Sequence, residues 1–114
     1  MHEISIAICI VDRVTEEIQS RGVPAIKAVH LSLGMLAGVD EQALQFCYKA
    51  ACEGTSLEGS DLVIETVEVV VYCSVCRLES AAESMQRLAC NRCNSAAQVV
   101  RGNELEVAAL EVAA

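Results

Sequence analysis

The chain has 114 residues, with sixteen acidic and eight basic side chains and a formal net charge of −8. That length suits one domain, or one domain carrying a small insert. The excess of acidic side chains and the scattered positions of the basic ones disfavour nucleic acid as a partner, because nucleic-acid binding requires clusters of lysine and arginine. No apolar run approaches the length of a membrane span, and the N-terminus lacks the basic region of a signal peptide. With seven cysteines and no such leader, we expect a reducing, cytoplasmic location and no membrane partner.

The first predicted element is an amphipathic helix over residues 4–21. Apolar side chains recur there at three- and four-residue steps, while acidic side chains fall outside that stripe. Gly22 and Pro24 supply the expected stop. The stripe predicted to be buried comprises Ile4, Ala7, Val11, Val14 and Ile18.

Residues 26–33 are predicted to form a half-buried strand, because their side chains alternate in polarity. The face expected to be buried carries Val29, Leu31 and Leu33. The opposite face carries Ala28, His30 and Ser32. His30 is therefore expected to be an ordinary strand residue, with a role as an auxiliary metal ligand as the alternative.

A second helix is predicted from Asp40 to Glu53, after a turn-bearing loop at residues 34–38. An aspartate carboxylate can accept hydrogen bonds from the first free N–H groups of a helix, so Asp40 is suited to cap it. Gly54 follows its end. The expected apolar stripe comprises Ala43, Leu44, Cys47, Tyr48 and Ala51.

Two further strands are predicted, one long and valine-rich at residues 62–72 and one at residues 104–112. We therefore predict an α+β fold in which a three-stranded sheet is covered by two helices on one face. A zinc-ribbon-like module with four cysteines would be inserted between the last two strands. In domain terms, residues 1–71 plus 103–114 would form the main domain and residues 72–102 the insert.

The insert carries two identical cysteine pairs, Cys73-x-x-Cys76 and Cys90-x-x-Cys93, separated by thirteen residues. Each pair can place two thiolates on one side of a tight turn, and two such turns supply the tetrahedral sulfur set that structural zinc prefers. Iron in a rubredoxin-like site and a redox dithiol are the alternatives. The presence of two identical Cys-x-x-Cys pairs favours zinc, because a redox motif would not ordinarily be duplicated.

Three cysteines lie outside these pairs, namely Cys9, Cys47 and Cys52. Cys9 and Cys47 have apolar neighbours in the sequence. A free cysteine in such surroundings usually behaves as a small buried hydrophobe. We therefore expect both side chains to be buried.

The N-terminus offers a different kind of metal site. Because His2 is one residue from the α-amino group, the amine, the His2 amide nitrogen and the imidazole can close two fused chelate rings around one ion. Amines and deprotonated amides impose a square-planar geometry, which suits Ni²⁺ or Cu²⁺ rather than tetrahedral Zn²⁺. Met1 should be retained, since initiator methionine is removed efficiently only before small residues. Glu3 could supply the fourth ligand of the metal ion. A single early histidine is, on its own, usually just a solvated residue.

Three features combine into a resemblance: Met1-His2-Glu3 opening an amphipathic helix, the Val39-Asp40 helix start, and the two cysteine pairs. Over essentially its whole length the chain resembles the nickel-incorporation metallochaperones of nickel–iron hydrogenase maturation, the HypA/HybF family. The resemblance implies a non-catalytic protein that delivers Ni²⁺ to the hydrogenase large-subunit precursor, alongside an accessory nickel-insertion GTPase. Some members also serve urease, so urease maturation proteins are additional candidate partners.

The resemblance also implies roles for single residues. His2 would be the principal nickel ligand, with Met1 and Glu3 beside it and Asp40 as an additional candidate, although capping alone explains an aspartate there. The ligands of structural zinc would be Cys73, Cys76, Cys90 and Cys93. The second pair reads Cys-Asn-Arg-Cys where Cys-Pro-x-Cys is frequent in the family, and no histidine lies near the zinc pairs.

Two other classes of protein compete with this interpretation. In an acidic zinc-ribbon protein-interaction module, His2 would be incidental. In a thiol oxidoreductase, one Cys-x-x-Cys pair would be catalytic and metal-free. The doubled cysteine pairs argue against the enzyme, and Met1-His2-Glu3 argues against the plain module.

Overall fold

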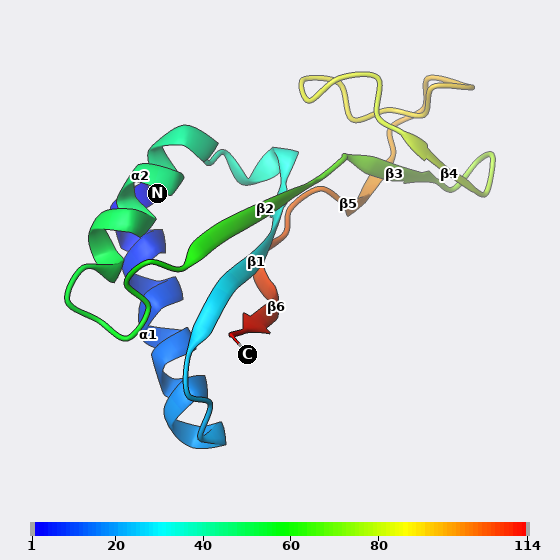
Figure 1. Cartoon of the computed structure of the whole chain (residues 1–114). Helices are drawn as coiled ribbons and strands as arrows, with labels where there is room; N and C mark the ends of the chain where they lie inside the picture. The colour runs from blue at the N-terminus through cyan, green and yellow to red at the C-terminus, as the bar shows by residue number, and fades with distance from the viewer. Residues whose placement is uncertain (1, 114) are drawn as a thin grey trace. The chain divides into compact units, whose positions relative to one another are not determined.

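The computed structural model describes residues 2–113, which form an α+β fold as predicted. The chain divides into two compact units, and Figure 1 traces it through both. Unit 1 comprises residues 1–31, 39–65 and 107–114, and unit 2 comprises residues 32–38 and 66–106. Within residues 2–113, no helix is long and apolar enough to cross a membrane.

Unit 1 begins with helix α1 (Glu3–Arg21), which ends as predicted at Gly22. Gly22 adopts a left-handed conformation (φ 67°) and donates its N–H to the Ile18 carbonyl. The prediction that Ile4 is buried was wrong, because the buried stripe is rotated along the helix and leaves Ile4 exposed. The buried residues of α1 are Ile6, Ala7, Ile10, Val11 and Val14.

Helix α2 (Glu41–Cys52) packs against α1 and is capped by Asp40, as predicted. The Asp40 Oδ1 atom accepts a hydrogen bond from the Ala43 N–H at 3.0 Å. The buried face of α2 is narrower than predicted and carries Leu44, Tyr48 and Cys52. Side chains at the flanks of this face, such as Cys47, are half-buried.

The main sheet contains β1 (Ile26–Gly34), β2 (Asp61–Val67) and β6 (Leu105–Val112), in the order β2-β1-β6. Figure 1 shows both helices on the same side of this sheet, which is the predicted packing. Val29, Leu31 and Leu33 are buried as expected. Ala28 was wrongly assigned to the open face, since it is buried along with Ile26 near the start of this central strand.

The valine-rich segment at residues 62–72 is two strands rather than the single strand predicted. The main sheet contains β2, whereas β3 (Val70–Cys73) belongs to a second sheet. Between them, the Val69 carbonyl accepts a hydrogen bond from the Ala82 N–H at 3.0 Å. The backbone thus changes its hydrogen-bonding partners at Val69, a change that a continuous run of valines does not signal.

The second sheet lies in unit 2 and has the order β4-β3-β5, with both pairings antiparallel. Its outer strands, β4 (Leu78–Ala81) and β5 (Gln98–Arg101), were not predicted from the sequence. Tyr72 on the central strand pairs with Glu79 on one side and with Gln98 on the other. Because β3 ends at Cys73, the first cysteine of the motif stands at the end of the central strand of this sheet.

Candidate metal centre

The four paired cysteines converge in unit 2, with their sulfur atoms all within 4.8 Å of one another. The Sγ atoms of Cys73 and Cys93 are 3.6 Å apart, and those of Cys90 and Cys76 are 3.9 Å apart. These separations exceed the ~2.05 Å of a disulfide bond. Four sulfurs at ~2.3 Å from a tetrahedral zinc ion would lie roughly 3.8 Å apart. The cluster therefore fits a zinc-sized ion.

The two cysteine pairs fold in the same way. The Arg77 N–H donates to the Cys73 carbonyl at 2.7 Å, and the Asn94 N–H donates to the Cys90 carbonyl at 2.9 Å. Arg77 (φ 57°) and Asn94 (φ 63°) are the non-glycine residues with positive φ in the described chain. Each follows the second cysteine of its pair, so each turn requires a left-handed residue at the same place.

These turns direct backbone N–H groups at the sulfur atoms. The Cys76 N–H donates to Cys73 Sγ at 3.4 Å, and the Arg92 N–H donates to Cys90 Sγ at the same distance. Hydrogen bonds to a sulfur favour its thiolate form, which is the form that binds metals. Each turn thus supplies one backbone N–H to the first sulfur of its pair.

The thiols of the cluster differ in acidity. Hydrogen bonding from Ser95 lowers the pKa of Cys93 to about 6, and the backbone N–H groups of Cys93 and Arg92 lower the pKa of Cys90. The pKa of Cys76 is raised to about 12, chiefly by its hydrogen bond with the Cys93 sulfur. Neighbouring thiolates repel one another, and a divalent cation removes that repulsion by binding them all.

His2 is exposed and stands at the N-cap of α1. Its carbonyl accepts hydrogen bonds from the N–H groups of Ser5 and Ile6, at 3.1 and 3.3 Å. The N–H groups at the very start of a helix have no carbonyl one turn earlier to bind. The amide nitrogens of His2 and Glu3 are therefore not needed by α1. The predicted role of Met1 lies outside the described residues.

The structure brings two of the predicted nickel-site residues together. The Asp40 N–H donates to the Glu3 Oε2 atom at 3.2 Å, which joins the start of α2 to the start of α1. The Asp40 side chain is exposed and caps α2 through Ala43. The Glu3 carboxylate therefore contacts the backbone at the start of α2, an arrangement that local sequence patterns could not reveal because 37 positions separate Glu3 from Asp40.

His30 lies within β1, where it is half-buried, and belongs to no cluster of metal-binding side chains among residues 2–113. Of the remaining cysteines, Cys52 is buried and its burial raises the pKa of its thiol. The prediction that Cys9 is buried was wrong, since it is exposed beside Ile8, and Cys47 is only half-buried. On a helix, apolar neighbours in the sequence face different directions, so they do not establish burial.

Comparisons with known proteins agree with this arrangement. Residues 1–112 match the family model described as "Hydrogenase/urease nickel incorporation, metallochaperone, hypA". The chain is 46% identical over 112 residues to the hydrogenase maturation factor HypA of Chloroflexus aurantiacus, covering 97% of this chain and 98% of the relative. It is 40% identical over 109 residues to HypA of Streptomyces avermitilis, covering 94% of this chain and 83% of the relative.

Solved structures show the same fold. The solution structure of the Ni metallochaperone HypA from Helicobacter pylori matches with a TM-score of 0.72 at 21% identity, covering 100% of this chain and 99% of that one. A second HypA solution structure matches with a TM-score of 0.75 at 20% identity, covering 99% and 97%. The family model and the curated relatives confirm the predicted resemblance to metallochaperones rather than enzymes. The chain belongs to the HypA family of hydrogenase and urease nickel-incorporation metallochaperones.

Proposed function

We propose that the protein carries one Ni²⁺ ion at its N-terminus and hands it to the hydrogenase large-subunit precursor, while its four-cysteine cluster holds a resident zinc ion. Membership of the family supports a nickel metallochaperone; the ligands and the recipient are our proposal. The observation that supports it is the hydrogen bond from the Asp40 N–H to the carboxylate of Glu3, the residue that follows the exposed His2.

The principal ligand is the His2 imidazole, supported by amide nitrogens that α1 does not use. Coordination by the amides of His2 and Glu3 would leave the bonds from Ser5 and Ile6 to the His2 carbonyl intact. Two deprotonated amides would balance the charge of Ni²⁺, which offsets the cost of holding a cation at the positive end of a helix. The amino group of Met1 would add one more nitrogen.

Glu3 and Asp40 contribute differently. The Glu3 carboxylate is held by the Asp40 backbone and stands next to His2 in the chain, so it can reach the ion or accept a hydrogen bond from its ligands. The Asp40 carboxylate already accepts the Ala43 N–H. Asp40 therefore acts first by positioning Glu3, and direct ligation by its side chain is the secondary possibility.

An exposed site at a chain end is suited to transfer. Its ligands can be replaced one at a time by those of a docked acceptor, whereas a closed four-sulfur cage holds its ion permanently. Amine and amide ligands must lose protons to bind, so nickel affinity should fall as the pH falls. We propose that an accessory nickel-insertion GTPase supplies the energy-dependent step, and that urease maturation proteins are a second class of partner.

The zinc proposal rests on the sulfur separations of 3.6 and 3.9 Å and on the two matching turns. Cys73, Cys76, Cys90 and Cys93 would hold the ion, whose contribution is to join the turn after β3 to the turn before β5. Four thiolates leave no open coordination position, so the role is structural.

Metal stoichiometry after dialysis against Ni²⁺ tests the proposal, with His2→Ala compared to the unmodified chain. The matched control is His30→Ala, which removes the other histidine of the sequence. We expect about one nickel and one zinc per chain for the unmodified protein and the control, and zinc alone for His2→Ala. Nickel retained by His2→Ala would move the site elsewhere, and no nickel in any sample would favour the zinc-ribbon interaction module.

A further inference from the structure

Unit 2 contains an open hollow of about 270 Å³ that the metal sites do not use. Segments from three parts of the unit line it: the turn after β1, the link between β2 and β3, and the end of β4 with the chain that follows it. The lining residues are Met35, Glu68, Val69, Ala81, Ala82, Glu83, Ser84 and Met85. We refer to this group as the methionine hollow.

One wall is a methionine on a fixed backbone. Both chain neighbours of Met35 are hydrogen-bonded through their N–H groups. The Gly34 N–H donates to the Glu104 carbonyl at 2.7 Å, and the Leu36 N–H donates to the Gly102 carbonyl at 2.8 Å. A Cβ atom on Gly34 would overlap the Gly102 carbonyl, so the two chain segments are in close contact. Met35 nevertheless leaves 45% of its surface exposed.

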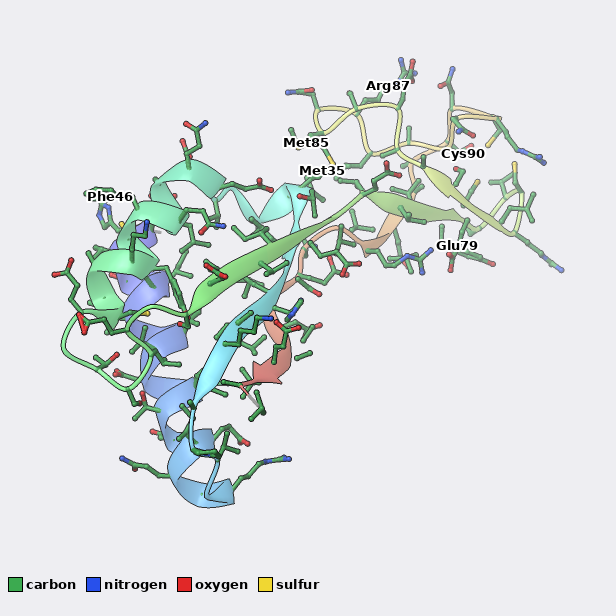
Figure 2. All side chains as sticks on the ribbon, in the orientation of Figure 1. Met35, Phe46, Glu79, Met85, Arg87 and Cys90 are labelled. Atoms are coloured by element: carbon green, nitrogen blue, oxygen red, sulfur yellow. The ribbon has the colours of Figure 1, made fainter. Side chains whose placement is uncertain are left out.

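The lining also includes a second methionine, Met85, on a hydrogen-bonded turn. The Arg87 N–H donates to the Ser84 carbonyl at 3.2 Å, which closes the turn that carries Met85. Met85 is 46% exposed and lines the same hollow as Met35, and Figure 2 labels both residues. Val69, which is buried, also lines the hollow.

The size and lining of the hollow suit a protein side chain. Sites for drug-sized molecules usually measure about 300–1,000 Å³, so this hollow is small for a cofactor. Methionine is flexible and polarizable, and exposed methionines commonly serve as adaptable apolar contacts in binding surfaces. The lining holds two such side chains, each with nearly half of its surface exposed.

The charged groups of the hollow are both carboxylates, from Glu68 and Glu83. Glu83 is 3.7 Å from Arg87, and both side chains are more than half exposed, so this ion pair is weak. Within the described residues, Glu68 has no ion-pair partner. An occupant that combines an apolar side chain with a positive charge would therefore match both the lining and the charge.

We propose that the methionine hollow docks a partner-protein segment that presents one large apolar side chain next to lysine or arginine. The apolar side chain would insert between Met35 and Met85, and the basic group would meet Glu68 and Glu83. This surface is separate from the residues assigned to nickel and to zinc, so the inference goes beyond metal carriage and does not depend on it.

Methyl NMR of the zinc-loaded full chain tests the proposal, because the sequence has only three methionines to label with carbon-13. The probe is a Gly-Lys-Leu-Lys-Gly peptide with blocked ends, and the comparison peptide is Gly-Glu-Leu-Glu-Gly. We expect saturable shifts of the Met35 and Met85 methyl signals with the basic peptide. The acidic peptide should cause no comparable shift.

Charge variants test the second half of the proposal. The double variant Glu68→Gln, Glu83→Gln should weaken binding of the basic peptide about three- to tenfold, since each exposed charge contact contributes modestly. Glu106→Gln, an exposed carboxylate of the same unit outside the hollow, should leave it unchanged. Unmoved methyl signals, equal binding of the acidic peptide, or undiminished binding by the double variant would overturn the proposal. So would methyl shifts that depend on protein concentration without peptide, because they would assign the hollow to a second copy of the chain.

Discussion

Unit 1 and unit 2 are stabilised by different interactions. Unit 1 buries the apolar faces of two helices and the side chains of a sheet, including Tyr48, Leu44 and Val29, so it has a continuous hydrophobic core. Unit 2 buries few apolar side chains among the described residues, and two of them are the cysteines Cys73 and Cys90. A buried aliphatic side chain contributes about 1.5–3 kcal/mol, whereas a structural zinc site contributes roughly 10–16 kcal/mol. Hydrophobic burial thus stabilises the unit assigned to nickel, and metal binding stabilises the other.

The largest effect should come from removing a ligand of the cluster. Cys73→Ser takes away a buried sulfur at the end of β3, so unit 2 should lose zinc and its strands should unfold. Amide hydrogen exchange measures this directly, with protection lost in β3, β4 and β5 and retained in α1 and α2. Cys9→Ser, at an exposed cysteine, is the control. Loss of protection in α1 as well would show that the two units are not stabilised independently.

A substitution in the hydrophobic core of unit 1 should destabilise unit 1 and leave the zinc site of unit 2 intact. Leu44→Ala opens a cavity at a fully buried position, so we expect the free energy of unfolding of unit 1 to fall by about 2–5 kcal/mol with zinc retained. Phe46→Ala is the control on the same helix, because that ring is 77% exposed and its loss should cost less than about 0.5 kcal/mol. Urea unfolding followed by circular dichroism measures both changes. Equal costs would contradict the assigned core.

The close approach between Gly34 and Gly102 gives a smaller, local prediction for unit 2. A methyl group at Gly34 would overlap a backbone carbonyl, so Gly34→Ala should destabilise unit 2 by about 3 kcal/mol. At Gly38 there is open space and only the left-handed backbone (φ 69°) opposes a side chain, so Gly38→Ala should cost about 1 kcal/mol. Thermal unfolding of the zinc-loaded variants ranks the two. The reverse ranking would mean that the two segments are not in contact.

The smallest predicted effect is a gain. Arg77 and Asn94 occupy left-handed positions in the two cysteine turns, and glycine would relieve that strain. Arg77→Gly should strengthen zinc retention by up to about 1 kcal/mol, and Asn94→Gly by less, because asparagine tolerates this conformation better than arginine. Competition with a chromogenic chelator measures the gain, and Arg92→Gly should give none. Weaker zinc retention by Arg77→Gly would contradict this prediction. It would mean that the Arg77 side chain stabilises the zinc-bound turn by more than its left-handed backbone destabilises it.

The elements that the sequence predicts well are those set by local chemistry. The helix stop at Gly22, the cap at Asp40 and the turn within each cysteine pair all depend on residues close in sequence. The convergence of the two pairs was predicted from the four ligands that one metal ion needs. The errors arise where distant contacts decide. The change of sheet at Val69 depends on Ala82, and β4 is too short and too mixed in polarity to show a strand pattern.

The candidate nickel site shows the same division. His2 could be identified from its position next to the N-terminus. The resemblance of the chain to a known family added Glu3 and Asp40 as candidate residues of the same nickel site. Their contact in space depends on how α1 and α2 pack, and no local pattern encodes that packing. Likewise, the exposure of Cys9 follows from the rotation of α1 against its neighbours rather than from the residues beside it.

X-ray absorption at the nickel and zinc edges of one doubly loaded sample tests the assignment of one metal to each unit most directly. We expect a nickel ion with nitrogen and oxygen neighbours and no sulfur, together with a zinc ion bound by four sulfurs at ~2.3 Å. Sulfur in the nickel shell, or imidazole nitrogen in the zinc shell, would contradict the division of metals between His2 and the four-cysteine cluster.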